Sequence, residues 1–193
     1  SPSTTVAGAT MSNVVLEIQN SVGGKLASAD TGVTAVIGSD GHPAGGSDLT
    51  GGSATASSGD VSFAGIAIDR NGPGFTLTFS GVALISVTTD AFVLQGKLLV
   101  QTQPSTVIAA ATMSNVVVQV VDNNDQVIAS AVDEVTASIQ TNLATGGVTA
   151  DLTGGSATAI SGAATFGSIS MAKHAAGFVL RFTAPNMAAT VDS

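Results

Sequence analysis

The chain contains the same stretch of sequence twice. Residues 49–56 read LTGGSATA, and the identical octapeptide returns 103 residues later at 152–159. An earlier stretch, residues 9–15 (ATMSNVV), returns at 111–117 with a spacing of 102, so one residue is inserted between the two stretches in the second copy. Repeats of stacked solenoids are only about 20–50 residues long, and a repeat of this length is therefore a whole domain. We expect two domains, residues 1–95 and 96–193, each large enough for its own core.

Apolar and polar residues alternate near the start of each copy. The apolar positions are Val14, Leu16 and Ile18 in the first copy and Val116, Val118 and Val120 in the second. A period of two with β-branched residues predicts a strand with one buried face, and the turn residues at 20–24 and 122–125 predict hairpins. Apolar residues nowhere recur at helical spacing over 11 or more residues, so we expect almost no helix.

Aromatic residues mark the predicted core. Six of the seven phenylalanines occupy matching positions in the two copies, namely Phe63, Phe75, Phe79, Phe166, Phe178 and Phe182. Aromatic side chains bury the largest apolar area, so these six are expected in the core. Short strands separated by turn residues at intervals of about 8–12 residues are typical of Greek-key β-sandwiches. The predicted fold is all-β, with two tandem β-sandwich domains.

Several short motifs relate the chain to a known family. They are the Leu-Thr-Gly-Gly segments at 49–52 and 152–155, residues 162–166 (GAATF), the Gly-Phe-x-Leu strands at 74–77 and 177–180, and residues 97–104 (KLLVQTQP). With these motifs the chain resembles the bacterial immunoglobulin-like (Ig-like) repeats of large surface, adhesin-like and some phage proteins. Residues 59–63 (GDVSF) depart from the pattern by carrying Val for Ala. Without Cys, Trp or Tyr, the chain has neither a disulfide packed on Trp nor a tyrosine corner.

The resemblance implies a structural role outside the cell. We expect spacer modules of an extracellular bacterial surface protein, fibre or filament, whose partners are neighbouring repeats or identical subunits in an extended assembly. The alternative is an adhesin or capsid-decoration module that binds glycan or protein through loops 38–48 and 140–151. Sugars usually stack on Trp or Tyr, and the chain has neither, so such binding would depend on polar loops.

Charge and hydropathy exclude other partners. Thirteen acidic and five basic residues give a net charge of −8, which repels phosphate backbones and argues against nucleic acid. The longest apolar run, residues 107–111, is far shorter than the ~20 residues of a membrane helix, so no membrane insertion is expected.

The sequence offers few groups for chemistry. The only histidines, His42 and His174, lie at unmatched positions and are expected in solvent-facing loops. No Gly-x-Ser-x-Gly nucleophile motif occurs, and the glycine pairs at 51–52 and 154–155 lack the Lys-Ser/Thr of a phosphate-binding loop. These glycines are expected to permit a bulge or bend. We therefore expect no enzyme activity and no cofactor.

An acidic segment of the second copy is a weak candidate for calcium. Asp122 and Asp125, joined by Asp133 and Glu134, could supply the oxygen ligands that calcium prefers. The first copy has no carboxylate in the matching turn, residues 20–24. An ordinary Asx hairpin turn is therefore the favoured interpretation.

The joint between the copies is represented only once. Alignment sets Asp90 opposite Ser193, and residues 91–103 then have no second counterpart. We expect each sandwich to lack one edge strand, because half of this joint is missing from each. Open edges invite pairing, so further repeats or a neighbouring chain are expected to cover them.

Overall fold

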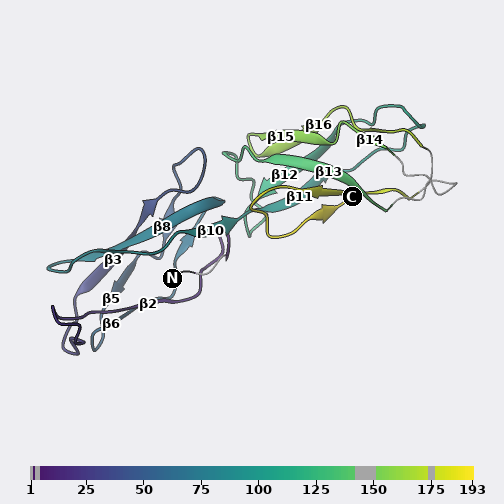
Figure 1. Cartoon of the computed structure of the whole chain (residues 1–193). Helices are drawn as coiled ribbons and strands as arrows, with labels where there is room; N and C mark the ends of the chain where they lie inside the picture. The colour runs from purple at the N-terminus through teal and green to yellow at the C-terminus, as the bar shows by residue number, and fades with distance from the viewer. Residues whose placement is uncertain (1, 3–4, 142–150, 174–176) are drawn as a thin grey trace. The chain divides into compact units, whose positions relative to one another are not determined.

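The computed structural model describes residues 2, 5–141, 151–173 and 177–193, and it forms two compact units, Ser1–Gln95 (unit 1) and Gly96–Ser193 (unit 2). Every element in the described residues is a β-strand (Figure 1). The predicted all-β class is therefore confirmed. The described part of the chain contains no helix that is long and apolar enough to cross a membrane.

Unit 1 is a sandwich of one large sheet and shorter strand pairs. The large sheet has the order β1 (Thr5–Val6), β10 (Phe92–Gln95), β8 (Gly72–Gly81), β3 (Gly32–Ser39) and β5 (Ser53–Thr55), with β9 (Val87–Thr88) also paired to β8. The opposing layer contains β2 (Val14–Glu17) paired with β6 (Asp60–Phe63), and β4 (Leu49–Thr50) pairs with β7 (Ala67–Ile68).

Unit 2 has a similar arrangement, with the additional strand β11 at one edge and, among the described residues, no strand that corresponds to β1 or β10. Its strands follow the order β11 (Lys97–Thr102), β12 (Val116–Val121), β16 (Ala163–Phe166), β15 (Ser156–Ile160), β13 (Glu134–Thr141), β18 (Val179–Thr183) and β19 (Val191–Asp192), while β14 (Leu152–Thr153) pairs with β17 (Ser170–Met171). Strand β15 pairs with β16 through its last residues and with β13 through its first ones. The layers β11-β12-β16-β15 and β13-β18-β19 have the strand order of an immunoglobulin constant domain. The predicted Greek-key sandwich is confirmed.

Matching aromatic pairs join the two layers of each unit. The ring centroids of Phe63 and Phe79 lie 5.1 Å apart, and those of Phe166 and Phe182 lie 5.4 Å apart, both at an interplanar angle of 55°. All four side chains are buried. Such aromatic pairs contribute about 0.5–1.5 kcal/mol beyond the apolar area that they bury.

The predicted core is wrong at Phe178. Its counterpart Phe75 is fully buried and packs on Phe92 of β10, with ring centroids 6.2 Å apart. Phe178 is only half-buried, because unit 2 contains no counterpart of β10 among the described residues.

The repeated glycines allow the backbone to bend where two segments approach closely. Gly51 and Gly154 have φ of +70° and +67°, in the left-handed region that favours glycine. A Cβ atom on Gly51 would overlap the carbonyl oxygen of Gly65, and one on Gly154 would overlap that of Ser168. The predicted bend is confirmed in both copies.

One alignment from the sequence needs correction. The N–H of Thr89 donates to Leu77 O and that of Ser193 to Leu180 O, both at 2.9 Å, so Thr89 is the counterpart of Ser193. The alignment of Asp90 with Ser193 is therefore wrong by one residue.

Candidate functional site

The acidic segment of unit 2 forms a hairpin turn. Asp122 Oδ1 accepts hydrogen bonds from the N–H groups of Asn124 and Gln126, both at 2.8 Å. Asp125 has a left-handed backbone and its carboxylate lies 2.7 Å from Lys97 Nζ. Asp122 thus bonds the backbone of its own turn, as the favoured interpretation predicts, whereas Asp125 pairs with a residue of β11.

The other two calcium candidates have separate partners. Glu134 accepts a hydrogen bond from the hydroxyl of Ser156, and the Asp133 carbonyl accepts the N–H of Ala159 at 2.9 Å. Within residues 2, 5–141, 151–173 and 177–193, no three His, Asp or Glu side chains are grouped so that they could hold a metal ion. The structure does not bring the four candidates together as a ligand set.

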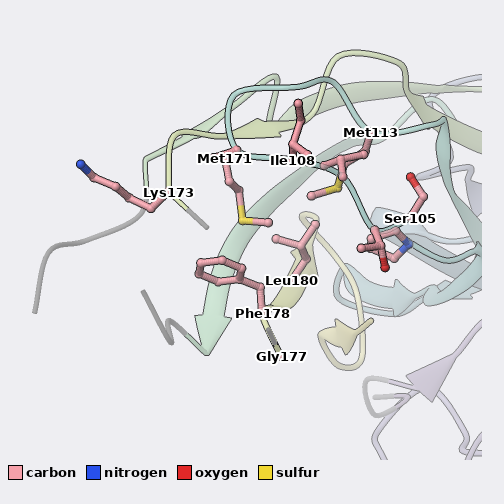
Figure 2. Close-up of a pocket in the computed structure, with 12 residues that line it drawn as sticks. Ser105, Ile108, Met113, Met171, Lys173, Gly177, Phe178 and Leu180 are labelled. Carbon is pink, nitrogen blue, oxygen red and sulfur yellow. The ribbon is translucent and has the colours of Figure 1, made fainter. Parts of the chain in front are cut away.

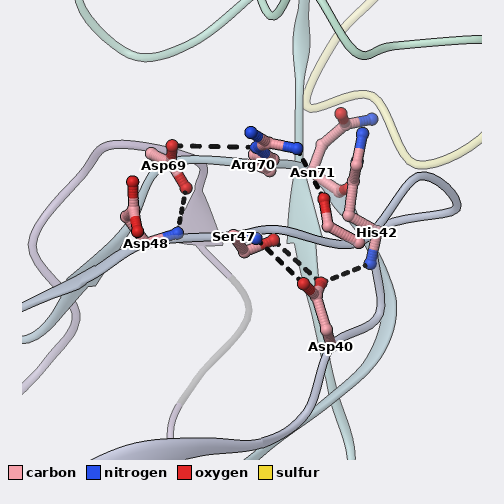
Figure 3. A network of polar contacts seen from close by, with 8 residues as sticks. Asp40, His42, Ser47, Asp48, Asp69, Arg70 and Asn71 are labelled. Atoms are coloured by element: carbon pink, nitrogen blue, oxygen red, sulfur yellow. Dashed lines mark hydrogen bonds and ion pairs between the residues drawn. The ribbon is translucent and has the colours of Figure 1, made fainter.

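His42 is buried, so the expectation of a solvent-facing residue is wrong. Only 4% of its surface is exposed, and its Nδ1 donates a hydrogen bond of 2.7 Å to the carbonyl oxygen of Asn71 (Figure 3). The reason is that loop 38–48 folds against residues 69–71, which are distant in sequence. His174 lies outside the described residues, as do residues 142–150 of the second candidate loop.

Asp40 organises loop 38–48 from within. Its carboxylate accepts hydrogen bonds from the N–H of His42 (3.0 Å), the N–H of Ser47 (2.9 Å) and the hydroxyl of Ser47 (2.8 Å) (Figure 3). Partial burial acts to raise the pKa of Asp40, but these hydrogen bonds and the nearby His42 together lower the pKa below its ordinary value. The ionised carboxylate therefore stabilises the folded loop.

Further polar contacts hold the loop to residues 69–71. Asp69 accepts the N–H of Asp48 at 2.8 Å, and the guanidinium of Arg70 donates to the carbonyl oxygen of Gly45. The contacts of this network are not those of a nucleophile and its base, because the Ser47 hydroxyl donates to Asp40 while His42 Nδ1 donates to a backbone carbonyl.

Unit 2 contains a groove beside β18 whose lining is mixed, with apolar side chains, small polar side chains and Lys173. We call it the β18 groove; it has a volume of about 320 Å³ and is lined by residues 104–109 together with Met113, Met171, Phe178 and Leu180. Figure 2 shows the side chains of Met113, Met171, Phe178 and Leu180 converging on it. The matching position in unit 1 is occupied by β10, whose Phe92 and Leu94 are buried.

Unit 1 contains a second groove, beside β2. This β2 groove has a volume of about 310 Å³, and its apolar lining includes Leu16, Ile18, Val61, Phe79 and Leu84. In unit 2 the matching edge is covered by β11, which pairs with β12 and buries Leu98 against it. Sequence reasoning did not name either groove. The sequence feature that could have indicated both grooves is the connecting segment, residues 91–103, which occurs only once in the sequence.

Comparisons with known proteins do not assign a family. No known family and no curated protein matches the sequence. Among solved structures, the chain is similar to a β-glycosidase from Bacteroides vulgatus with a TM-score of 0.37 and 10% identity, over 94% of this chain and 24% of that one. It is similar to a β-glucuronidase from Parabacteroides merdae with a TM-score of 0.33 and 12% identity, over 86% of this chain and 20% of that one. The chain thus spans about a quarter or less of these enzymes, and similarity at this level establishes neither a common family nor a common activity.

Proposed function

We propose that the two units are structural spacer modules of an extracellular bacterial surface protein, fibre or filament. The observation that carries the proposal is the position of the connecting segment. Strand β10 ends at Gln95 as part of unit 1, and β11 begins at Lys97 as part of unit 2, so only Gly96 separates them. One half of the connection is a strand of unit 1 and the other half is a strand of unit 2, so almost none of its residues lie outside the two sheets. A connection of this kind suits modules that transmit load along a chain.

The separate cores support the same role. The unit 1 core cluster consists only of residues between Met11 and Leu94, and unit 2 has its own buried Phe166 and Phe182. Each module can therefore resist unfolding without the other, since its cooperative core is closed within its own residues. Joining such modules lengthens a protein without enlarging any core.

Single-molecule force spectroscopy tests this proposal. The 193-residue chain would be placed between marker domains and stretched. Two separate unfolding events are expected, each lengthening the chain by roughly 30 nm, because an extended chain spans about 3.3–3.6 Å per residue. A single event of about twice this length, or extension without a resolvable force peak, would contradict a load-bearing role for two modules.

Binding through loop 38–48 is the second candidate function. The hydrogen bonds of Asp40 and Arg70 hold this loop in one conformation, and a preorganised loop loses less entropy when it binds a glycan or protein. Asp40→Ala should then weaken binding to an adhesin-type ligand on a glycan or protein array, while Val22→Ser in a distant exposed turn should not. Equal binding by both variants would remove this candidate.

A further inference from the structure

We propose that the parallel pair of strands β1 and β10 is the mechanical clamp of unit 1, the contact that must rupture before this unit unfolds under tension. The inference deepens the load-bearing role and rests on it, because it names the contacts that resist the load. It concerns unit 1 alone. Its support is the direction in which the two strands run and the contacts that hold each of them.

The first and last strands of unit 1 are neighbours in its large sheet and run parallel. Thr5 lies opposite Leu94, Val6 lies opposite Gln95, and the N–H of Ala7 donates to Gln95 O at 2.8 Å. Tension pulls the start of the first strand and the end of the last strand in opposite directions. Two parallel neighbours are then drawn past each other along their length, so their evenly spaced hydrogen bonds are loaded together. Neighbouring strands that are pulled apart from one end would instead lose their hydrogen bonds one after another.

Strand β10 is held on both of its sides. Its other neighbour is β8, to which it is antiparallel, with Phe92 opposite Phe75. Phe92 and Leu94 are buried, and the ring centroids of Phe92 and Phe75 lie 6.2 Å apart. Sliding of β10 would therefore expose two large apolar side chains to water in addition to breaking hydrogen bonds, and both effects raise the barrier to rupture.

The segment that follows β1 is fixed to residues 66–68. The N–H of Gly8 donates to Ile68 O at 2.7 Å, and the N–H of Met11 donates to Ile66 O at 2.8 Å. Ala7, at the end of β1, is fully buried. These contacts keep β1 in place beside β10, so the pair is the first contact that tension on the start of unit 1 loads.

A different attachment point would load β10 in another direction. Loop 38–48 is bonded to residues 69 and 70 (Figure 3), next to Gly72, which lies opposite Leu94 near the end of β10. Ala44 is an exposed residue of this loop. Tension between Ala44 and the end of β10 therefore separates β10 from β8 starting at one end. The hydrogen bonds of β10 then break in succession, which requires a lower force.

Force spectroscopy on the full 193-residue chain in two pulling geometries tests the inference. The chain contains no Cys, so Ala44→Cys provides a unique attachment point. Stretching from residue 44 to the end of the chain should lengthen unit 1 by roughly 17 nm, because only residues 44–95 of this unit are under tension. This event should occur at a lower force than the unit 1 event of the chain stretched from its two ends. The unit 2 event should keep its force in both geometries and serves as the internal reference.

Substitutions test the same contact with the chain stretched from its two ends. Ala7→Pro removes the N–H that donates to Gln95 O, and at constant force it should speed the unfolding of unit 1 roughly twofold to tenfold, the factor for one hydrogen bond. Val6→Pro is the matched control, because successive N–H groups of a strand point to opposite sides and that of Val6 points away from β10. Ile66→Val, at a buried position, should lower the stability measured in urea but leave the rate at constant force nearly unchanged.

Two results would overturn the inference. One is an equal force for the unit 1 event in the two pulling geometries, a comparison that stands even where Ala7→Pro does not fold. The other is a rate at constant force that Ile66→Val raises as much as Ala7→Pro does. Failure of the spacer role is a different result, namely the absence of two separate events when the unsubstituted chain is stretched from its ends.

Discussion

Replacing Phe182 by Ala should destabilise unit 2 selectively. The side chain is fully buried, and its ring centroid lies 5.4 Å from that of Phe166 across the two layers. A Phe→Ala change in a core costs about 3–5 kcal/mol, which includes the lost burial and the cavity that remains. At about 1.4 kcal/mol per factor of ten, unit 2 should open two to four orders of magnitude more often.

Hydrogen exchange measured by mass spectrometry resolves this effect by unit. Peptides from 96–193 should exchange faster in Phe182→Ala, whereas peptides from 1–95 should keep the rates of the unsubstituted chain. The matched variant Phe79→Ala, which removes the partner of Phe63 at 5.1 Å, should produce the reverse pattern. If either variant accelerated exchange equally in both units, the assignment of a separate core to each unit would be refuted.

Three further changes have defined outcomes. Gly51→Ala should lower the melting temperature, because it places a methyl group on a left-handed backbone against the carbonyl oxygen of Gly65, at a cost of at least about 1 kcal/mol. Calorimetry measures the change, and Gly32→Ala, whose added methyl group contacts no other atom, is the control. Asp40→Asn should reduce stability near neutral pH. Because the pKa of Asp40 is lowered in the folded protein, its contribution to stability is present above its unfolded pKa of about 3.9 and is lost as pH falls through the folded pKa. The free energies of unfolding of the two proteins, measured in urea, should therefore converge in acid. A difference that stays constant with pH would contradict this. Calcium and chelator should leave the melting temperature unchanged, and a calcium-dependent rise of several degrees would instead make the acidic turn a ligand set.

Local sequence patterns predicted the strands because the relevant forces are local. The alternation at Val14–Glu17 and Val116–Val121 places one side of each strand against the core. Left-handed glycines and Asx turns depend mainly on their own residues, so Gly51, Gly154 and Asp122 behave as the sequence indicates.

The incorrect predictions depend on contacts between distant segments. His42 is buried because residues 69–71 pack against its loop, and no periodicity near residue 42 records that contact. Phe178 has the sequence context of Phe75, yet its exposure is decided by whether a strand like β10 covers it. Each groove lies at an edge that is covered by a strand in the other unit, by β10 in unit 1 or by β11 in unit 2. Only the fact that residues 91–103 occur once in the sequence could have indicated this difference.

The most direct test of two self-contained modules is to express residues 1–95 and 96–193 separately. Amide correlation spectra of the two fragments should be well dispersed. Added together, they should coincide with the spectrum of the 193-residue chain except near the boundary at Gln95 and Gly96. If either fragment gave the narrow amide dispersion of an unfolded chain, the account of two independent β-sandwich modules would be contradicted.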